Sequence, residues 1–295
     1  MTESTPLVGP NERIGSPATG VGRWWVYLAV ALGGTWVFWL AAIALGVSFD
    51  SALGLVLLLV GLATPGVTGV VFVYLVYDER GRADFWNRIT QPRRIGVRWL
   101  AVILLVPLAV TAIGGVVDLL LGGVGPAWGE GVTQFGVNPL AILPALFFAT
   151  LPPILEELGW RGYALDRLQL RWSALTASLI LGVVWSVWHV PLFFVEGSFQ
   201  HDAVGFGTTG FWLFTAGIVA LSVVFTWIYN NTDHSVLGIV VLHGWVNFTA
   251  EVVVVPDPAY YALWFVLAGA FVWVWGAKST RGTDDVPHPP LPSDP

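Results

Sequence analysis

Long apolar stretches alternate with short polar segments along almost the whole chain. A helix that spans a membrane needs about 20 mainly apolar residues, and eight stretches come close to that length or exceed it. They are residues 24–46, 52–77, 99–121, 139–158, 174–195, 211–229, 235–255 and 259–277. The pattern predicts an all-α, polytopic membrane protein with about eight transmembrane helices.

The composition agrees with a membrane protein and excludes several functions. The chain is 56% hydrophobic and 11% charged, whereas soluble domains carry about 25% charged residues. There is no basic stripe of the kind that binds nucleic acid, so we expect no nucleic-acid partner. The absence of cysteine excludes disulfides, thiolate metal sites and a cysteine nucleophile.

Lys and Arg are restricted to four regions of the chain. They occur before the first apolar stretch, after the second, after the fourth and after the eighth. With eight spans all 13 of them lie on one side of the membrane, and Lys and Arg concentrate on the cytoplasmic side. We therefore expect both termini to be cytoplasmic in an integral, multi-pass protein of the cell (plasma) membrane.

The polar ends of the chain differ from the apolar part between them. Residues 1–22 are polar with Pro and Gly, and residues 279–295 are rich in Pro and Asp, so we expect disordered tails. Residues 23–278 are predicted to form a single membrane-embedded domain, with a core of about 139–255 that carries the candidate chemistry.

Two adjacent glutamates lie near the end of the fourth apolar stretch. Neighbouring residues on a helix point about 100° apart, so Glu156 and Glu157 cannot share one task. Arg161 follows Glu157 by four residues and therefore lies on the same face. We expect a Glu157–Arg161 ion pair and a Glu156 side chain that turns into the bundle. The alternative is a solvated helix end.

Polar side chains also occur in two later stretches. His189 lies among aromatic residues, where an imidazole hydrogen-bonded to a backbone carbonyl freed by Pro191 is the alternative to a functional role. His243 and Asn247 are four residues apart and face the same way. An imidazole and an amide aimed at one point suit an oxyanion, and a polar contact between helices, worth about 0.6 kcal/mol, is the alternative.

These four candidates come from three different spans of a chain almost free of other intramembrane charge. A carboxylate and an imidazole can deprotonate water, while a second imidazole and an amide can stabilise a tetrahedral intermediate. The set therefore indicates a hydrolase. Two other functions stay open: a transporter or channel with these residues along its path, and a non-catalytic immunity or partner protein on the same scaffold.

Three short motifs carry a resemblance to a known family. The segments Glu156–Arg161, Trp185–His189 and His243–Asn247 resemble, in this order, the motifs of the CAAX protease and bacteriocin-processing family (CPBP, also called Abi). This family of intramembrane endopeptidases includes the type II CAAX prenyl proteases. Its pattern more usually has phenylalanine at the position of Trp185, and the tryptophan should preserve the packing role.

The resemblance implies roles for individual residues. Glu156 would be the catalytic carboxylate and His189 its partner in activating water. His243 and Asn247 would stabilise the oxyanion, with Glu157 and Arg161 as a supporting pair. The active site would face the cytoplasm, and the partner would be a membrane-associated or lipidated protein substrate within the lipid bilayer.

Metal dependence is the open chemical question. Glu156, His189 and His243 could bind zinc with an open position. The spacing lacks the compact His-Glu-x-x-His pattern, and asparagine is a poor zinc ligand. We therefore favour a metal-free, glutamate-dependent mechanism with no cofactor.

The candidate residues sit at different depths in straight helices. At 1.5 Å per residue, His189 lies about 22 Å from residue 174, whereas Glu156 lies close to the end of its own stretch. We expect the fourth helix to continue through 163–168 and the fifth to enter the membrane later than residue 174.

Overall fold

The structure, a computed structural model, describes residues 24–281 and consists almost entirely of helices. The long helices are α1 (Trp24–Leu45), α2 (Ala52–Val76), α4 (Gly96–Leu120), α6 (Ile142–Gly159), α8 (Ala174–Trp188), α9 (Thr209–Asn231), α10 (Val236–Val252) and α11 (Asp257–Trp275). The shorter elements are α3 (Glu79–Thr90), η2 (Pro92–Arg94), β1 (Ala127–Trp128), α5 (Glu130–Val137), η3 (Pro139–Ala141), η4 (Trp160–Ala164), α7 (Leu165–Gln169), η5 (Val190–Phe194), η6 (Gln200–Val204) and β2 (Val253–Val254).

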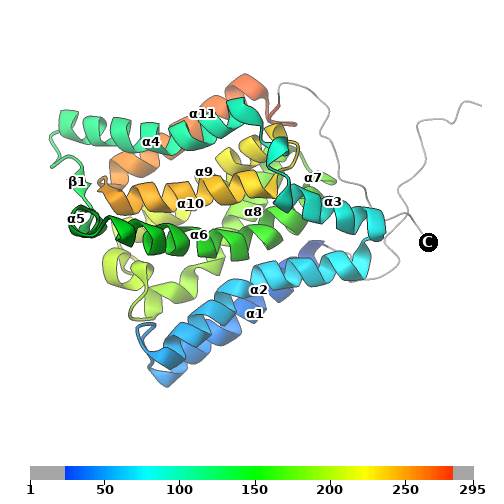
Figure 1. The fold of residues 1–295 in the computed structure, drawn as a ribbon, viewed down its shortest axis with the longest axis horizontal. Helices are drawn as coiled ribbons and strands as arrows, with labels where there is room; N and C mark the ends of the chain where they lie inside the picture. Colours follow the sequence, from blue (N-terminus) through cyan, green and yellow to red (C-terminus); the bar gives the residue numbers. More distant parts are fainter. Residues whose placement is uncertain (1–23, 282–295) are drawn as a thin grey trace, which may run out of the picture.

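The long helices form two layers (Figure 1). One layer runs α2, α6, α10 and α4, and the other runs α1, α8, α9 and α11, with neighbours packed in that order. The layers join at both edges, where α1 packs on α2 and α4 packs on α11. Side chains of the central helices α6, α8, α9 and α10 therefore meet between the layers.

All eight predicted apolar stretches are helical, which confirms the all-α polytopic fold. Seven helices of the described part are long and apolar enough to cross a membrane. The eighth, α10, is also apolar but has only 17 residues, fewer than the predicted 235–255.

The fourth helix continues past its predicted end, as expected. A π-helical turn, η4, and then α7 extend the helical segment as far as Gln169. The fifth helix, α8, begins at Ala174, and its entry into the membrane later than residue 174 stays a prediction. The backbone N–H groups of its first turn all have acceptors. Ser173 Oγ accepts from the Thr176 N–H. The carbonyls of Lys278 and Ala277 accept from the N–H groups of Ala174 and Leu175.

The described part of the chain continues after α11 to residue 281. Ser279 and Thr280 are buried, and Asn230 Nδ2 donates to Ser279 O at 2.9 Å. The predicted disordered tail 1–22 and the rest of the predicted tail, residues 282–295, lie outside the described residues.

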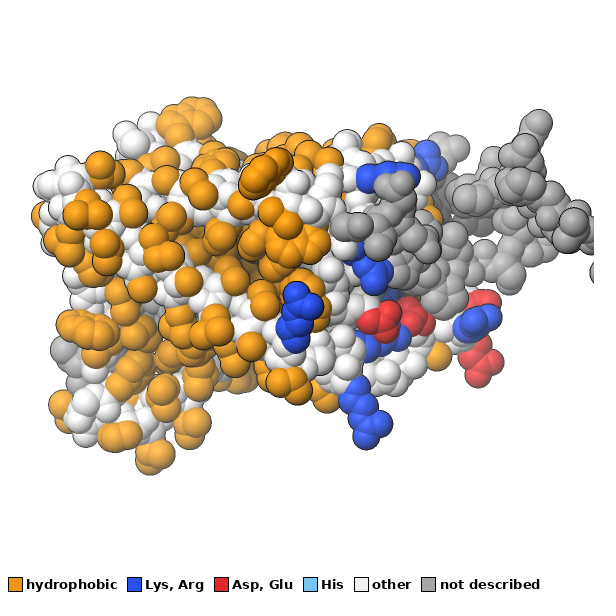
Figure 2. Space-filling view, turned by 90° about the horizontal axis from the view of Figure 1, so that it is seen from above, with side chains coloured by type: hydrophobic (Ala, Val, Ile, Leu, Met, Phe, Trp, Pro, Cys, Tyr) orange, Lys and Arg blue, Asp and Glu red, His pale blue; other side chains and the backbone are white. Residues whose placement is uncertain are grey.

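Charged side chains gather at one end of the bundle. Figure 2 shows Lys and Arg at the end where α3 lies, and apolar side chains over the remainder of this face. The polar helix α3 was not predicted, because it is too polar for a membrane span. It begins at an N-cap in which Asp78 Oδ1 accepts from the Gly81 N–H. At the other end, β1 and β2 form a short antiparallel pair.

Helix α6 lies unusually close to α2. A Cβ atom added at Gly66 would lie 2.3 Å from Leu155 O, and one at Gly69 would lie 2.8 Å from Gly159 Cα. Only glycine allows this approach, which brings the backbone around Glu156 against α2.

Prolines inside the long helices leave carbonyl groups without their usual donors. In a membrane protein such groups are satisfied by neighbouring helices. Thr35 Oγ1 on α1 donates to Gly61 O, the carbonyl freed by Pro65, at 2.8 Å. Asn247 Nδ2 on α10 donates to Ala149 O, the carbonyl freed by Pro153, at 3.3 Å.

Replacing Thr35 by valine should lower the free energy of unfolding by about 1–3 kcal/mol, because the buried carbonyl of Gly61 loses its donor and the indole N–H of Trp188 loses its acceptor. Thermal or chemical unfolding of the purified protein in detergent measures this change. Thr64→Val is the matched control, since Thr64 Oγ1 donates only to the carbonyl of its own preceding turn. Equal effects of the two variants would contradict the role given to Thr35.

Candidate active site

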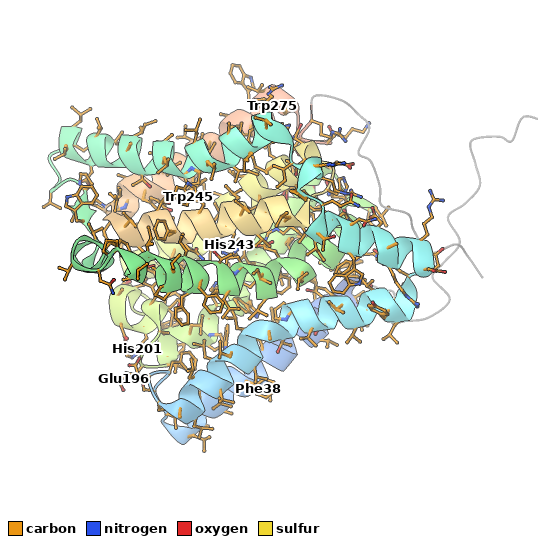
Figure 3. All side chains as sticks on the ribbon, viewed as in Figure 1. Phe38, Glu196, His201, His243, Trp245 and Trp275 are labelled. Carbon is orange, nitrogen blue, oxygen red and sulfur yellow. The ribbon has the colours of Figure 1, made fainter. Side chains whose placement is uncertain are left out.

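The predicted site residues come from three of the central helices, α6, α8 and α10, or from their ends. Glu156 lies on α6, Trp185 on α8, His189 at the C-terminal cap of α8, and His243 and Asn247 on α10. Figure 3 places His243 midway along the bundle, far from the exposed Glu196 and His201.

The indole of Trp185 connects three of these side chains. Its Nε1–H donates to Glu156 Oε2 at 2.7 Å. Its ring centroid lies 5.9 Å from that of His189 and 5.2 Å from that of His243. Trp185 therefore orients the carboxylate and separates the two imidazoles, which is more than the packing role expected from the sequence.

Glu157 forms the predicted ion pair and a further contact that was not predicted. Arg161 Nη1 lies 2.9 Å from both carboxylate oxygens of Glu157. His243 Nδ1 lies 2.9 Å from Glu157 Oε1, and a carboxylate can only accept there, so Nδ1 carries a proton. The supporting pair thus fixes the tautomer and the orientation of His243.

Arg161 is held between two aromatic rings in addition to its carboxylate partner. Its guanidinium carbon lies 4.7 Å from the ring centroid of Trp185 and 4.9 Å from that of Phe225 on α9. Such contacts with aromatic faces stabilise a desolvated cation. The contribution of α9 was not predicted, since Phe225 looks like any other apolar residue of a span.

His189 makes the kind of hydrogen bond that was considered as the alternative to a functional role. Its Nδ1 lies 2.7 Å from the carbonyl oxygen of Trp185. That carbonyl is available because α8 ends at Trp188. Since a carbonyl only accepts, Nδ1 carries the proton and the neutral ring keeps a lone pair on Nε2.

Asn247 likewise serves as a polar contact between helices, through the bond to Ala149 O described above. This bond uses one of the two N–H groups of the amide. The second is left for another acceptor, so the structural contact and a role at an oxyanion are compatible.

Exposure separates the two glutamates. Glu156, His189 and His243 keep 4%, 9% and 6% of their surface exposed, whereas Glu157 and Arg161 keep 0%. The supporting pair is therefore fully buried, while the three candidate catalytic groups are buried but keep a small exposed fraction.

The residues fit a metal ion poorly. Within residues 24–281 no group of three or more His, Cys, Asp or Glu side chains is placed to hold one. The hydrogen bonds at Glu156 and the two histidines leave one carboxylate oxygen and each Nε2 free, so the poor fit follows from the placement of the side chains and not from these bonds. No step of the reaction below is derived through a metal.

The fold and this cluster define a polytopic helical membrane protein with a carboxylate and histidine centre between its two layers. Comparison with known proteins agrees with this description. The family model of type II CAAX prenyl endopeptidase Rce1-like proteins matches residues 138–249. CAAX prenyl protease 2 of Methanococcus maripaludis is 27% identical over 227 residues, which cover 75% of this chain and 81% of that protein.

The matched segment contains the candidate catalytic residues and the supporting pair. The chain is therefore similar to CAAX-protease-like endopeptidases, as its motifs indicated, and both comparisons indicate a peptidase. The apolar helices make it an integral membrane protein.

The contrast between the two glutamates predicts that the same substitution affects stability strongly at one position and weakly at the other. Glu157→Gln leaves the buried Arg161 without a charged partner and should reduce the free energy of unfolding by about 3–5 kcal/mol. Glu156→Gln keeps an oxygen for the Trp185 N–H and should change it by less than about 1 kcal/mol. Unfolding of both purified variants in detergent, against the wild type, measures the difference. A stable Glu157→Gln variant would show that the ion pair is not structural.

Proposed function

We propose that this peptidase hydrolyses its substrate with a water molecule activated by Glu156 and His189, and that His243 and Asn247 stabilise the oxyanion. The observation that carries the proposal is the difference in exposure between these groups and the sealed Glu157–Arg161 pair. Both oxygens of Glu157 are bonded to Arg161, whereas Glu156 keeps one oxygen and His189 keeps Nε2 for water.

Water activation follows from the hydrogen bonds already made. Trp185 occupies one oxygen of Glu156, so the other oxygen can accept a proton from water. Because Nδ1 of His189 donates to a carbonyl, its Nε2 can accept a second hydrogen bond from the same water. The water oxygen then attacks the peptide carbonyl carbon while its proton passes to Glu156.

The attack moves negative charge to the peptide oxygen. The second Asn247 N–H can donate to this oxyanion. His243 can donate from Nε2 when its ring is doubly protonated, and the carboxylate of Glu157 at Nδ1 offsets the charge of that form. Donors already fixed by other bonds need little reorganisation, which is the basis of oxyanion stabilisation.

Collapse of the tetrahedral intermediate breaks the C–N bond. The proton held by Glu156 passes to the leaving nitrogen, so the products are a carboxylic acid and an amine. Glu156 returns to its starting state, and the net reaction consumes one water molecule for each peptide bond.

The substrate proposed is a membrane-anchored or lipidated protein that is cleaved near its C-terminus. The relative from Methanococcus maripaludis is named a CAAX prenyl protease, and the apolar exterior of this chain keeps its active site within reach of lipid-anchored segments (Figure 2). The distribution of Lys and Arg supports a site open to the cytoplasm and cytoplasmic termini in the cell membrane.

Glu156→Gln should reduce cleavage by about 10²–10⁴-fold, the usual contribution of a general base. The purified protein in lipid vesicles can be assayed with a peptide whose prenylated cysteine is followed by three residues. Comparison of the membrane proteomes of wild-type and Glu156→Gln cells would identify natural substrates as uncleaved proteins. A folded variant with wild-type cleavage would exclude Glu156 as the base.

Cleavage should persist after treatment with EDTA or 1,10-phenanthroline, because the ligand set fits a metal poorly. The assay uses the same vesicles and peptide, and a known zinc peptidase serves as the control for chelation. Loss of activity that added zinc restores would show that Glu156, His189 and His243 act as metal ligands.

A further inference from the structure

A second buried polar cluster lies at the end of the bundle where α3, α7 and the loop between α9 and α10 meet. Its members are Asp84, Arg88, Asp166, Tyr229 and His234. Arg88 and Asp166 are each 1% exposed, and His234 is 4% exposed. No member of this cluster takes part in the proposed reaction.

Asp166 on α7 is the centre of the cluster. Its Oδ2 accepts from Arg88 Nη1 at 2.5 Å and from the Tyr229 hydroxyl at 3.0 Å. Its Oδ1 lies 3.0 Å from His234 Nδ1. Arg88 Nη2 also donates to Gly162 O at 3.3 Å, so α3 is bonded both to α7 and to the π-helical turn that follows the two glutamates.

The loop that begins α10 has an unfavourable backbone conformation. Asp233 and His234 have φ values of 49° and 56°, in the left-handed region that residues other than glycine rarely adopt. Such conformations persist where the surroundings hold them. Arg94 Nη1 donates to Asp233 O at 2.8 Å, and Asp166 holds His234.

The two histidine contacts have matching spacing along antiparallel segments. Asp166 follows Glu157 by nine residues, and His234 precedes His243 by nine. The Glu157–His243 and Asp166–His234 contacts therefore connect the α6–α7 segment to α10 at two levels. Two such contacts fix the position of α10 along its axis relative to α6.

The buried loop also explains how the candidate residues meet. Because α10 begins at the fully buried Val236, it starts inside the bundle. His243, seven residues later, is about 10.5 Å deeper still. The fourth helical segment continues beyond the two glutamates to Gln169, so Glu156 and Glu157 also lie inside the bundle and not at its end.

We propose that Arg88, Asp166 and His234 are positioning residues that set the register of α10, and with it His243 and Asn247, against Glu156. This inference rests on the proposed function, because the register matters for catalysis only if His243 and Asn247 act together with Glu156. These three residues do not contact the reacting groups, yet their loss should appear mainly in the rate of the chemical step.

The test replaces His234 by alanine in the full-length protein in lipid vesicles, with the prenylated peptide as the probe. A shift of about 1 Å in the oxyanion donors should lower kcat per folded molecule by about 10- to 100-fold. KM should change by less than about threefold, because the donors act mainly in the transition state.

His234→Gly separates the hydrogen bond from the backbone strain. Glycine adopts the left-handed conformation without strain, so this variant should be more stable than His234→Ala but equally slow. Gln169→Ala is the control at the same end of the bundle, because Gln169 bonds Asn230 on α9 and not α10. It should lower stability while specific activity stays unchanged.

The register of α10 can also be measured without an activity assay. Because the chain has no cysteine, two introduced cysteines can only cross-link with each other. A Cβ atom built on Gly244 lies 3.4 Å from Thr150 Cα, so cysteines at these two positions lie close enough to serve as a cross-linking pair. The cross-linking rate should fall in the His234→Ala background and stay unchanged in the Gln169→Ala background.

Unchanged cross-linking together with unchanged kcat per folded His234→Ala molecule would overturn the positioning role. Recovery of full activity in His234→Gly would also overturn it, because stability alone would then explain the loss. An active Glu156→Gln variant would contradict the proposed function instead, while the cross-linking result would still decide the register.

Discussion

The contact between Glu157, Arg161 and His243 is the interaction on which the arrangement between the layers depends. A fully buried carboxylate in an apolar bundle needs compensation, because desolvation of an unpaired charge costs several kcal/mol. Arg161 supplies the opposite charge from the same helix, and His243 supplies a second donor from α10. The pair can be satisfied in this way only if α6 and α10 lie side by side at this level.

That requirement extends to the backbone. Pro153 frees the carbonyl of Ala149, and Asn247, one helical turn beyond His243, donates to it. On the other side of α6, glycines of α2 allow the helix to approach so closely that no Cβ would fit. The segment that carries the two glutamates is thus fixed from both neighbouring helices, and the side chain of Glu156 is left as the one that faces Trp185.

Local patterns predicted part of this structure well. The eight apolar stretches are helices because length and hydropathy are local properties, and the Glu157–Arg161 pair follows from a spacing of four residues. The donor bond of Trp185, the partner of His243 and the polar cluster around Asp166 join residues 29, 86 and up to 141 positions apart. Such contacts leave no periodic signal, and Arg88 looked like any basic residue of a cytoplasmic loop.

The same geometry explains why the proposed chemistry is assigned to only one of two identical neighbours. Successive side chains on a helix diverge by about 100°, so α6 can present one glutamate to an arginine on its own face and the other to an indole across the layers. The first carboxylate has a permanent partner in Arg161, whose Nη1 lies 2.9 Å from both of its oxygens. The second is held by a single neutral donor, so one oxygen stays available for water. The proposed difference in function therefore follows from the angle between adjacent residues and from the partners that each side chain contacts.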